Sequence, residues 1–117
     1  MEEIKLYRMA SMPGANCKVA IKFEDGVPTE IALISYTTTV VVLKKNGDKY
    51  SMECSGTYSQ TTRRHINRFT KEFTGENMYY SCRDAVSRGD VFVDWIPAKS
   101  VIDQANRYKQ YGKISRN

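Results

Sequence analysis

The chain has 117 residues, of which 41% are hydrophobic and 26% charged, and its net charge at pH 7 is +5. This length suits one domain with one hydrophobic core, and this composition excludes a chain that is disordered throughout. No apolar run approaches the roughly 20 residues that a membrane-spanning helix needs, and the acidic residues 1–5 lack the apolar stretch of a signal peptide. We therefore expect a single domain over residues 1–112 and a loose tail over residues 113–117, located in the cytoplasm.

The cysteines and the single histidine argue against a metal site. Cys17, Cys54 and Cys82 are far apart in the chain and form no CxxC pair, so we expect three free thiols in a reducing compartment. No Cys, His or carboxylate cluster has the spacing of metal ligands, and no glycine-rich phosphate-binding loop is present. We therefore expect neither a metal nor a cofactor.

The first half of the sequence has the period-two alternation of β-strands. Residues 4–9 can form a strand, and residues 17–24 alternate between an apolar side and a charged side. Residues 25–29 contain Gly and Pro and predict a turn, which leads into a further strand over residues 30–36.

A β-hairpin over residues 39–55 is the clearest local signal. The Asn-Gly pair at 46–47 is typical of a type I′ turn, whose two central residues need positive φ. A loop of those two residues pairs Lys45 with Asp48 and Leu43 with Tyr50. With the two preceding strands, the hairpin predicts a four-stranded antiparallel meander over residues 17–55. The inward face of the hairpin then carries Val41, Leu43, Tyr50, Met52 and Cys54.

The hydrophobic period changes to that of a helix after residue 56. Ser59 or Thr61 can cap the start of this helix and Gly75 can close its end, which predicts a helix over residues 59–74. Its apolar stripe, at positions i, i+4, i+7 and i+11, consists of Thr62, Ile66, Phe69 and Phe73.

Two shorter helices and a strand are predicted in the last third of the chain. A serine followed three residues later by an aspartate, the pattern that opens many helices, occurs at Ser81 and at Ser100. The first predicts a short helix that ends at Gly89, and the second a C-terminal helix to about residue 111. Between them, residues 91–96 predict a strand that Pro97 ends. The predicted fold class is α+β: an antiparallel meander of four to six strands, packed by a basic amphipathic helix and followed by a short helix, a strand and a C-terminal helix.

Basic side chains on the helix over residues 59–74 are the main candidates for a binding site. Guanidinium groups bind phosphate oxygens in a bidentate way, and asparagine can read a base edge. The C-terminal residues 97–117 add five Lys and Arg against one Asp. We therefore predict binding through Arg63, Arg64, His65, Asn67, Arg68 and Lys71, with Lys109 and Lys113 extending the patch. Candidate stacking surfaces are Tyr58, Tyr79, Tyr80, Tyr108 and Tyr111. The alternative interpretation is a solvated amphipathic helix with no partner.

A catalytic role would have to use His65, because the chain has no other histidine. The available nucleophiles, none of which lies in a nucleophile motif, are Cys54, Cys82, Ser59 and Thr61. The structural alternative is that His65 forms a hydrogen bond with the loop that precedes its helix.

Residues 58–69, with the sequence YSQTTRRHINRF, resemble a motif of small uncharacterised proteins from phages and plasmids of gut bacteria and Firmicutes. In those proteins a strand pair leads into YSxTTxxHIxxF, and the resemblance covers roughly residues 36–95. It implies a mobile-element origin, and small proteins of that source without catalytic motifs are often inhibitors of host machinery, including anti-CRISPR proteins. Many anti-CRISPR proteins are acidic DNA mimics, whereas this chain is basic, so the resemblance implies contact with guide RNA, DNA or an acidic protein groove.

We therefore expect a non-enzymatic phage or mobile-element protein that acts in the cytoplasm of a bacterial host. Its expected partner is a nucleic acid or a nucleoprotein complex such as a CRISPR effector, with no membrane and no small-molecule cofactor. The first alternative is a protein–protein interaction module or a homodimer without nucleic-acid contact. The second is a small hydrolase or nuclease that uses His65.

Overall fold

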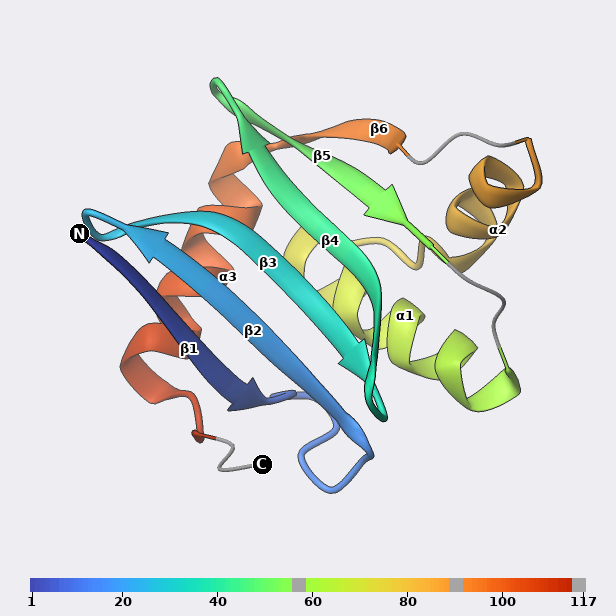
Figure 1. Ribbon diagram of the computed structural model, residues 1–117, viewed down its shortest axis with the longest axis horizontal. Coiled ribbons are helices and arrows are strands. Elements are labelled where there is room, and N and C mark those ends of the chain that lie inside the picture. The colour runs from blue at the N-terminus through green and yellow to red at the C-terminus, as the bar shows by residue number, and fades with distance from the viewer. Residues whose placement is uncertain (56–58, 89–91, 115–117) are drawn as a thin grey trace.

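The computed structural model shows an antiparallel sheet packed by helices, which confirms the predicted α+β class (Figure 1). It describes residues 1–55, 59–88 and 92–114. The elements within these ranges, in chain order, are β1 (Glu2–Arg8), β2 (Cys17–Glu24), β3 (Val27–Ser35), β4 (Thr38–Asn46), β5 (Lys49–Cys54), α1 (Gln60–Thr74), α2 (Tyr79–Ser87), β6 (Phe92–Pro97) and α3 (Ala98–Tyr111).

The six strands pair in the order β1-β2-β3-β4-β5-β6, and every neighbouring pair is antiparallel. The predicted meander over residues 17–55 is therefore confirmed, with β1 added at one edge. The predicted C-terminal strand is present as β6, which lies beside β5 after the chain has passed through α1 and α2; residue 91 lies outside the described residues.

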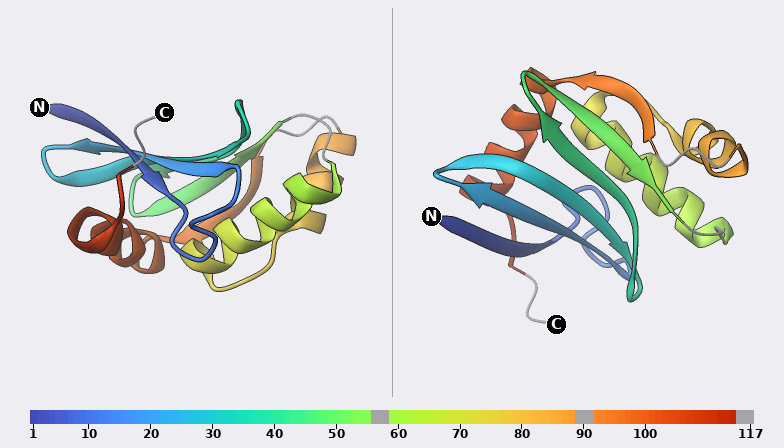
Figure 2. Two further views of the ribbon diagram at one scale, coloured as in Figure 1. Left: turned by 90° about the horizontal axis from the view of Figure 1, so that it is seen from below. Right: turned by 45° about the horizontal axis from the view of Figure 1, so that its top comes forward.

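The helices cover one face of the sheet. Figure 2 shows α1 and α3 beneath the sheet, whereas none of the helices that the structure describes lies on the opposite face. The alternating side chains that point toward the helices are fully buried. The core members contributed by the strands include Val19, Ile21, Ile31, Leu33, Val41, Leu43, Tyr50 and Met52, and those from the helices include Ile66, Phe69, Phe73, Val101, Ala105 and Tyr108. Each buried Val, Leu, Ile, Met or Phe side chain stabilises the fold by about 1.5–3 kcal/mol relative to an exposed one, so this core fixes the position of α1.

The turn of the β4–β5 hairpin lies one residue later than predicted. Asn46 pairs with Lys49 and Lys45 with Tyr50, so the two-residue loop is Gly47-Asp48 and not Asn46-Gly47. Gly47 has a φ of 64° and stands at the first central position, where type II′ turns place glycine. Each residue of β4 therefore pairs with a residue of β5 that lies two positions later than predicted, and two positions keep the same face of the strand. The predicted inward face is therefore unchanged, and its five members are all buried.

The β2–β3 turn is shorter than the predicted residues 25–29. It consists of Asp25 and Gly26 alone, with φ of 52° and 82°, and β3 already begins at Val27. Pro28 lies within β3 opposite Phe23, where the register of the pair shifts. A bulge of this kind tolerates proline because the strand ladder is locally interrupted.

Helix α1 follows its prediction closely. Ser59 caps the start, since its side chain accepts a hydrogen bond from the backbone N–H of Thr62 at 3.2 Å. Gly75 ends the helix with a φ of 84°, and its N–H donates to the carbonyl of Lys71 at 3.1 Å. The predicted apolar stripe is buried against the sheet.

Helices α2 and α3 begin two residues earlier than predicted. Ser81 and Ser100 therefore lie inside their helices, and neither serves as the predicted cap. The N-terminus of α2 is bonded by α1 instead: the N–H of Met78 donates to Thr70 Oγ1, and the N–H of Tyr79 to Asn67 Oδ1, both at 3.0 Å. Helix α2 ends at Ser87; the predicted end at Gly89 lies outside the described residues.

The predicted loose tail begins with two ordered residues. The N–H of Arg8 donates to the carbonyl of Lys113 at 2.8 Å, and Tyr7 forms an isolated bridge with Ile114. The domain therefore extends to residue 114, and residues 115–117 lie outside the described part. Within the described ranges, no helix has the length and apolarity to cross a membrane.

Candidate interaction surface on helices α1 and α2

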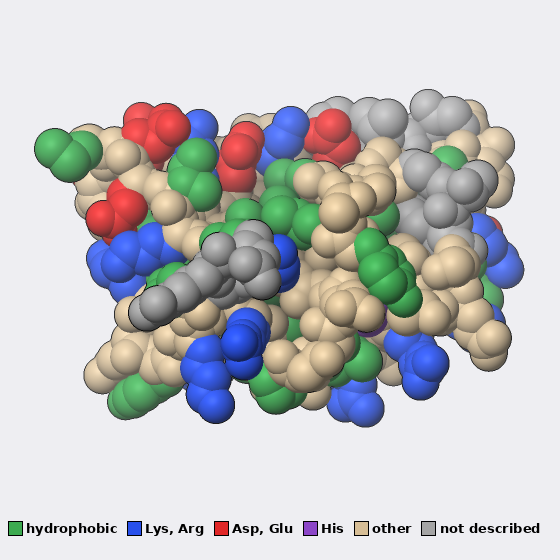
Figure 3. All heavy atoms as spheres, turned by 60° about the horizontal axis from the view of Figure 1, so that its bottom comes forward, with side chains coloured by type: hydrophobic (Ala, Val, Ile, Leu, Met, Phe, Trp, Pro, Cys, Tyr) green, Lys and Arg blue, Asp and Glu red, His purple; other side chains and the backbone are tan. Residues whose placement is uncertain are grey.

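Helix α1 turns three basic side chains to solvent. Arg64, Arg68 and Lys71, at positions i, i+4 and i+7, are exposed on the side opposite the buried stripe. In the face drawn in Figure 3, Asp and Glu side chains lie at the upper part of the molecule, while the charged side chains over the lower half are Lys and Arg. We call Arg64, Arg68 and Lys71 the basic stripe.

The basic stripe forms no ion pair among the described residues. The salt bridges within the described part of the chain involve other cations, namely the amino group of Met1 and the side chains of Lys5, Lys22, Lys44, Arg83 and Lys99. Lys71 Nζ donates to the carbonyl of Gly75 at 3.0 Å, which leaves its charge without a carboxylate. Among the described residues, no carboxylate therefore neutralises the charge of the basic stripe.

An Arg–Tyr cluster lies beside the basic stripe, where α1 meets α2. The Arg63 guanidinium carbon is 5.1 Å from the Tyr79 ring centroid and 4.9 Å from that of Tyr80, and Arg63 also donates a hydrogen bond to the Tyr80 hydroxyl. On α2, Arg83 stands 4.7 Å from the same Tyr80 centroid. Tyr80 remains 50% exposed, so the cluster is at the surface. Sequence reasoning found Arg63, Tyr79 and Tyr80 but missed Arg83. The i, i+3 spacing of Tyr80 and Arg83 in a helix was the available signal.

Asn67 supports α2 and does not face outward as a free polar contact. It is half-buried, and its Oδ1 accepts the N–H of Tyr79 at 3.0 Å. The predicted reading of a base edge would require this acceptor to leave the first turn of α2. The hydrogen bond instead fixes the start of α2, with Tyr79 and Tyr80, relative to α1.

His65 is buried, with only 1% of its surface exposed, so it lies away from the predicted binding face. Its Nδ1 is 2.9 Å from Ser35 Oγ on β3, and its ring is 5.9 Å from that of Tyr36. Burial, and secondarily the positive charge of Arg64, lowers the pKa of His65, so the imidazole is neutral. The predicted bond to the preceding loop is therefore replaced by a bond to the sheet.

The catalytic alternative finds no accessible pair of nucleophile and histidine among the residues that the structure describes, because His65 is buried. The bonded Ser35 is 3% exposed, and the Ser59 side chain is used as the helix cap. Cys54 and Cys82 are buried side by side, with their sulfur atoms 2.7 Å apart. No carboxylate among the described residues forms a hydrogen bond with His65, and there is no group of three or more metal-ligating side chains in the same ranges.

Lys109 and Lys113, the predicted extension of the patch, lie on other parts of the fold than α1. Lys109 Nζ lies 5.1 Å from the Phe23 ring centroid on β2, in a hollow shared with Glu3 and Asp25. Lys113 is on the segment that pairs with β1. Of the other predicted stacking residues, Tyr108 is buried, Tyr111 is exposed on α3 and Tyr58 lies outside the described residues.

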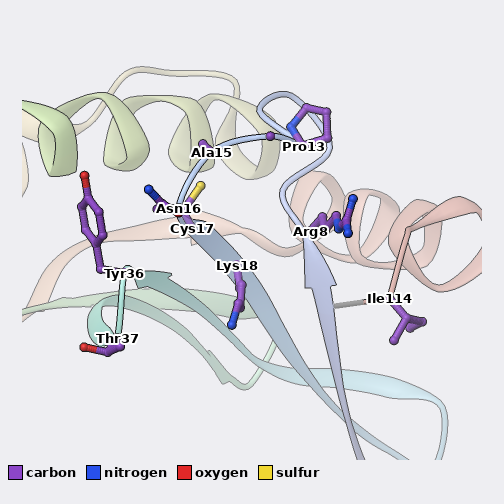
Figure 4. A pocket seen from close by; sticks show the side chains of 10 residues that line it. Arg8, Pro13, Ala15, Asn16, Cys17, Lys18, Tyr36, Thr37 and Ile114 are labelled. Atoms are coloured by element: carbon purple, nitrogen blue, oxygen red, sulfur yellow. The ribbon is translucent and has the colours of Figure 1, made fainter. Parts of the chain in front are cut away.

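A separate hollow of about 660 Å³ opens where the loop after β1 meets the β3–β4 turn (Figure 4). Its lining includes Arg8, Lys18 and Tyr36, the last of which stands beside α1. Its described lining contains no His, Asp or Glu, and Cys17 within it is 4% exposed. The hollow therefore offers no acid–base pair.

These features define an α+β protein whose helical layer carries a basic and aromatic surface. The chain belongs to a family of unknown function (DUF8033), whose model matches residues 7–87. That span runs from β1 to the last residue of α2, so it includes the basic stripe and the Arg–Tyr cluster. Neither a curated protein nor a solved structure matches the chain.

Proposed function

We propose that this chain is a non-enzymatic binding protein of a phage or other mobile element, which engages a nucleic acid or nucleoprotein complex through α1. The observation that carries the proposal is the exposed basic stripe without carboxylate partners among the described residues. The planar guanidinium fork suits phosphate oxygens, and the helix sets the spacing of Arg64 and Arg68 along its surface. Burial of Phe69 and Phe73 on the opposite side fixes the backbone that carries them.

The resemblance of residues 58–69 to phage and plasmid proteins supports a counter-defence role. In this role the protein would occupy a surface of a host complex, such as a CRISPR effector with its guide RNA, in the bacterial cytoplasm. The burial of His65 and Ser35 supports a binding role and not a catalytic one, because a substrate could not reach the pair without local unfolding.

The salt dependence of nucleic-acid affinity tests the proposal. Phosphate contacts release counterions, so affinity should fall steeply between about 50 and 300 mM salt, with a log–log slope of roughly 0.7–0.9 per contact. Replacing both arginines of the stripe, Arg64→Gln with Arg68→Gln, should weaken binding and reduce that slope. The matched control is Lys45→Gln with Lys49→Gln, two exposed cations at the β4–β5 turn. Phosphate contact through α1 would be refuted by an affinity that does not change with salt concentration, or by equal losses of affinity in the two double variants.

The open face of the sheet favours a second candidate function, contact with a protein or with a second copy of the chain. Leu6, Ala20, Ala32 and Val42 stand opposite one another in a single row across β1 to β4, and each is only half-buried. The next row, Lys22, Glu30 and Lys44, alternates in charge. An apolar row beside alternating charges suits a complementary protein surface better than a polyanion.

Light scattering and a nuclease-treated pull-down separate this second candidate from the first. Dimerisation that is lost in Ala32→Glu, together with partner capture that survives nuclease, would favour the sheet face. A monomer that captures its partner only while nucleic acid is intact would favour α1.

A further inference from the structure

We infer that the Arg–Tyr cluster is a stacking site for an unpaired base, so that the nucleic acid bound by α1 is single-stranded. The strand would place its phosphates along the basic stripe and one base against Tyr80 and its neighbouring guanidinium groups. This inference rests on the proposed function and names the ligand class of the same surface.

The geometry of the cluster supplies the stacking surface. Two guanidinium groups lie within 5 Å of the Tyr80 ring centroid, Arg63 at 4.9 Å and Arg83 at 4.7 Å. The Tyr80 hydroxyl accepts a bond from Arg63, so the ring and the guanidinium are held together before any ligand arrives. Aromatic rings and guanidinium planes are the groups on which proteins stack exposed bases.

The cluster sits on a rigid support. Helix α2 is joined to α1 by the bonds from Tyr79 N–H to Asn67 and from Met78 N–H to Thr70. Its other side is anchored in the core through Cys82, which is fully buried against Cys54 of β5. A ring on a fixed helix loses little conformational freedom when a base stacks on it.

The charges around Tyr80 fit a phosphate backbone. Arg83 is paired with Asp84 at 3.2 Å, but both side chains are more than half exposed, so this pair contributes little and can exchange for a phosphate. The basic stripe runs along the adjacent helix. In a duplex the bases are already paired and stacked inside, so only an unpaired base can reach an exposed ring such as Tyr80. Because every base has a π-face, the site should show little sequence preference.

Fluorescence anisotropy with a labelled oligothymidylate of about 15 nucleotides tests the inference against a duplex of equal length. We expect the wild-type protein to bind the single strand more tightly than the duplex. Tyr80→Leu should weaken single-strand binding by about tenfold and leave the duplex affinity nearly unchanged. Tyr80→Phe keeps the ring and should stay within about threefold of wild type. Tyr111→Leu is the matched control, because Tyr111 is 74% exposed at the end of α3, and Figure 1 shows α3 and α2 on opposite sides of the molecule.

The outcomes separate this inference from the proposed function. If Tyr80→Leu, shown by its melting temperature to be folded, binds the single strand as wild type does, the stacking site is refuted while phosphate contact by α1 stands. Duplex affinity equal to single-strand affinity refutes the inference in the same way. If neither nucleic acid binds at low salt, the proposed function fails and the inference with it.

Discussion

Arg68 and Glu72 stand four residues apart on α1 but do not pair, because the Glu72 carboxylate is bound by Tyr108 of α3. The Tyr108 hydroxyl donates to Glu72 Oε1 at 2.6 Å, and Gln104 donates to the same oxygen at 3.1 Å. The other oxygen accepts the N–H of Ser11 at 3.0 Å. Burial, followed by the Glu72 charge, raises the pKa of Tyr108, which keeps the donating proton on its hydroxyl. One carboxylate thus joins α1, α3 and the loop after β1, and Arg68 at the surface has no ion pair within the described part of the chain.

We expect Glu72→Gln to destabilise the fold by about 2 kcal/mol, because several bonds to a charged, partly buried acceptor are weakened together. Chemical denaturation measures this as a lower free energy of unfolding. Asp103→Asn is the matched control, since it removes the exposed pair with Lys99 at 2.8 Å and should cost far less than Glu72→Gln. Equal losses in the two variants would show that Glu72 is no more than a surface charge.

Asn67→Ala should destabilise the protein by about 1–2 kcal/mol, because the N–H of Tyr79 loses its acceptor. Asn67→Asp keeps an acceptor oxygen and adds negative charge at the N-terminus of α2, so it should retain most of the stability. The control is Asn106→Ala, an exposed asparagine inside α3 that should be nearly neutral. Both comparisons use the free energy of unfolding from denaturant curves. A loss at Asn106 as large as that at Asn67 would contradict the capping role.

The sequence was sufficient to predict α1 and the meander because their signals are local. Ser59, Gly75 and the apolar stripe act within one helix, and strand alternation survives a shifted turn, as the β4–β5 hairpin shows. The start of α2 was misplaced because its N-terminus is satisfied from another helix, by Asn67 and Thr70. A hydrogen bond between two elements cannot be predicted from the local sequence pattern of either element.

In the candidate site, too, the features set by local sequence were predicted, and those set by contacts between elements were not. The outward direction of Arg64 and Arg68 follows from helical period alone, and the sequence predicted it. The burial of His65 depends on which β-strand lies beneath α1, and its partner Ser35 is 30 residues away in the chain. The positions of Lys109 and Lys113 likewise depend on how α3 packs. A count of charges along the sequence gives no information on that packing.

The stability of the protein should fall as the pH falls through the range of the single histidine. The pKa of His65 is lowered in the fold by burial and by Arg64, so the unfolded chain takes up the proton more readily than the folded one. The stabilising contribution is therefore complete above the ordinary pKa of about 6.5 and is lost progressively below it. Free energies of unfolding at pH values between about 7.5 and 5.5 measure the effect.

His65→Gln is the control for this pH dependence, because it removes the titrating group while keeping a side chain that can form hydrogen bonds. The variant should have a flatter stability profile over the same interval. A wild-type protein that became more stable on acidification would mean that a charged imidazole is favoured in the fold, against the geometry of its buried site.

The three cysteines should be unreactive in the folded protein and fully reactive once it unfolds. Cys17, Cys54 and Cys82 are 4%, 1% and 0% exposed, and burial, with the Glu72 charge, raises the pKa of Cys17 to about 11. The hydrogen bond with Cys54, followed by burial, raises the pKa of Cys82 as well. Since the thiolate is the reacting form, an aromatic disulfide reagent should react slowly with native protein at neutral pH.

The number of thiols released on unfolding without reductant tests whether Cys54 and Cys82 are joined. Three equivalents are expected for free thiols, and two for Cys17→Ser, which removes the cysteine that has no sulfur neighbour. One equivalent from the wild-type chain and none from Cys17→Ser would show a bond between the two sulfur atoms that lie 2.7 Å apart. In that case α2 would be covalently tied to β5, and Tyr80 and Arg83 would be fixed to the sheet by more than packing.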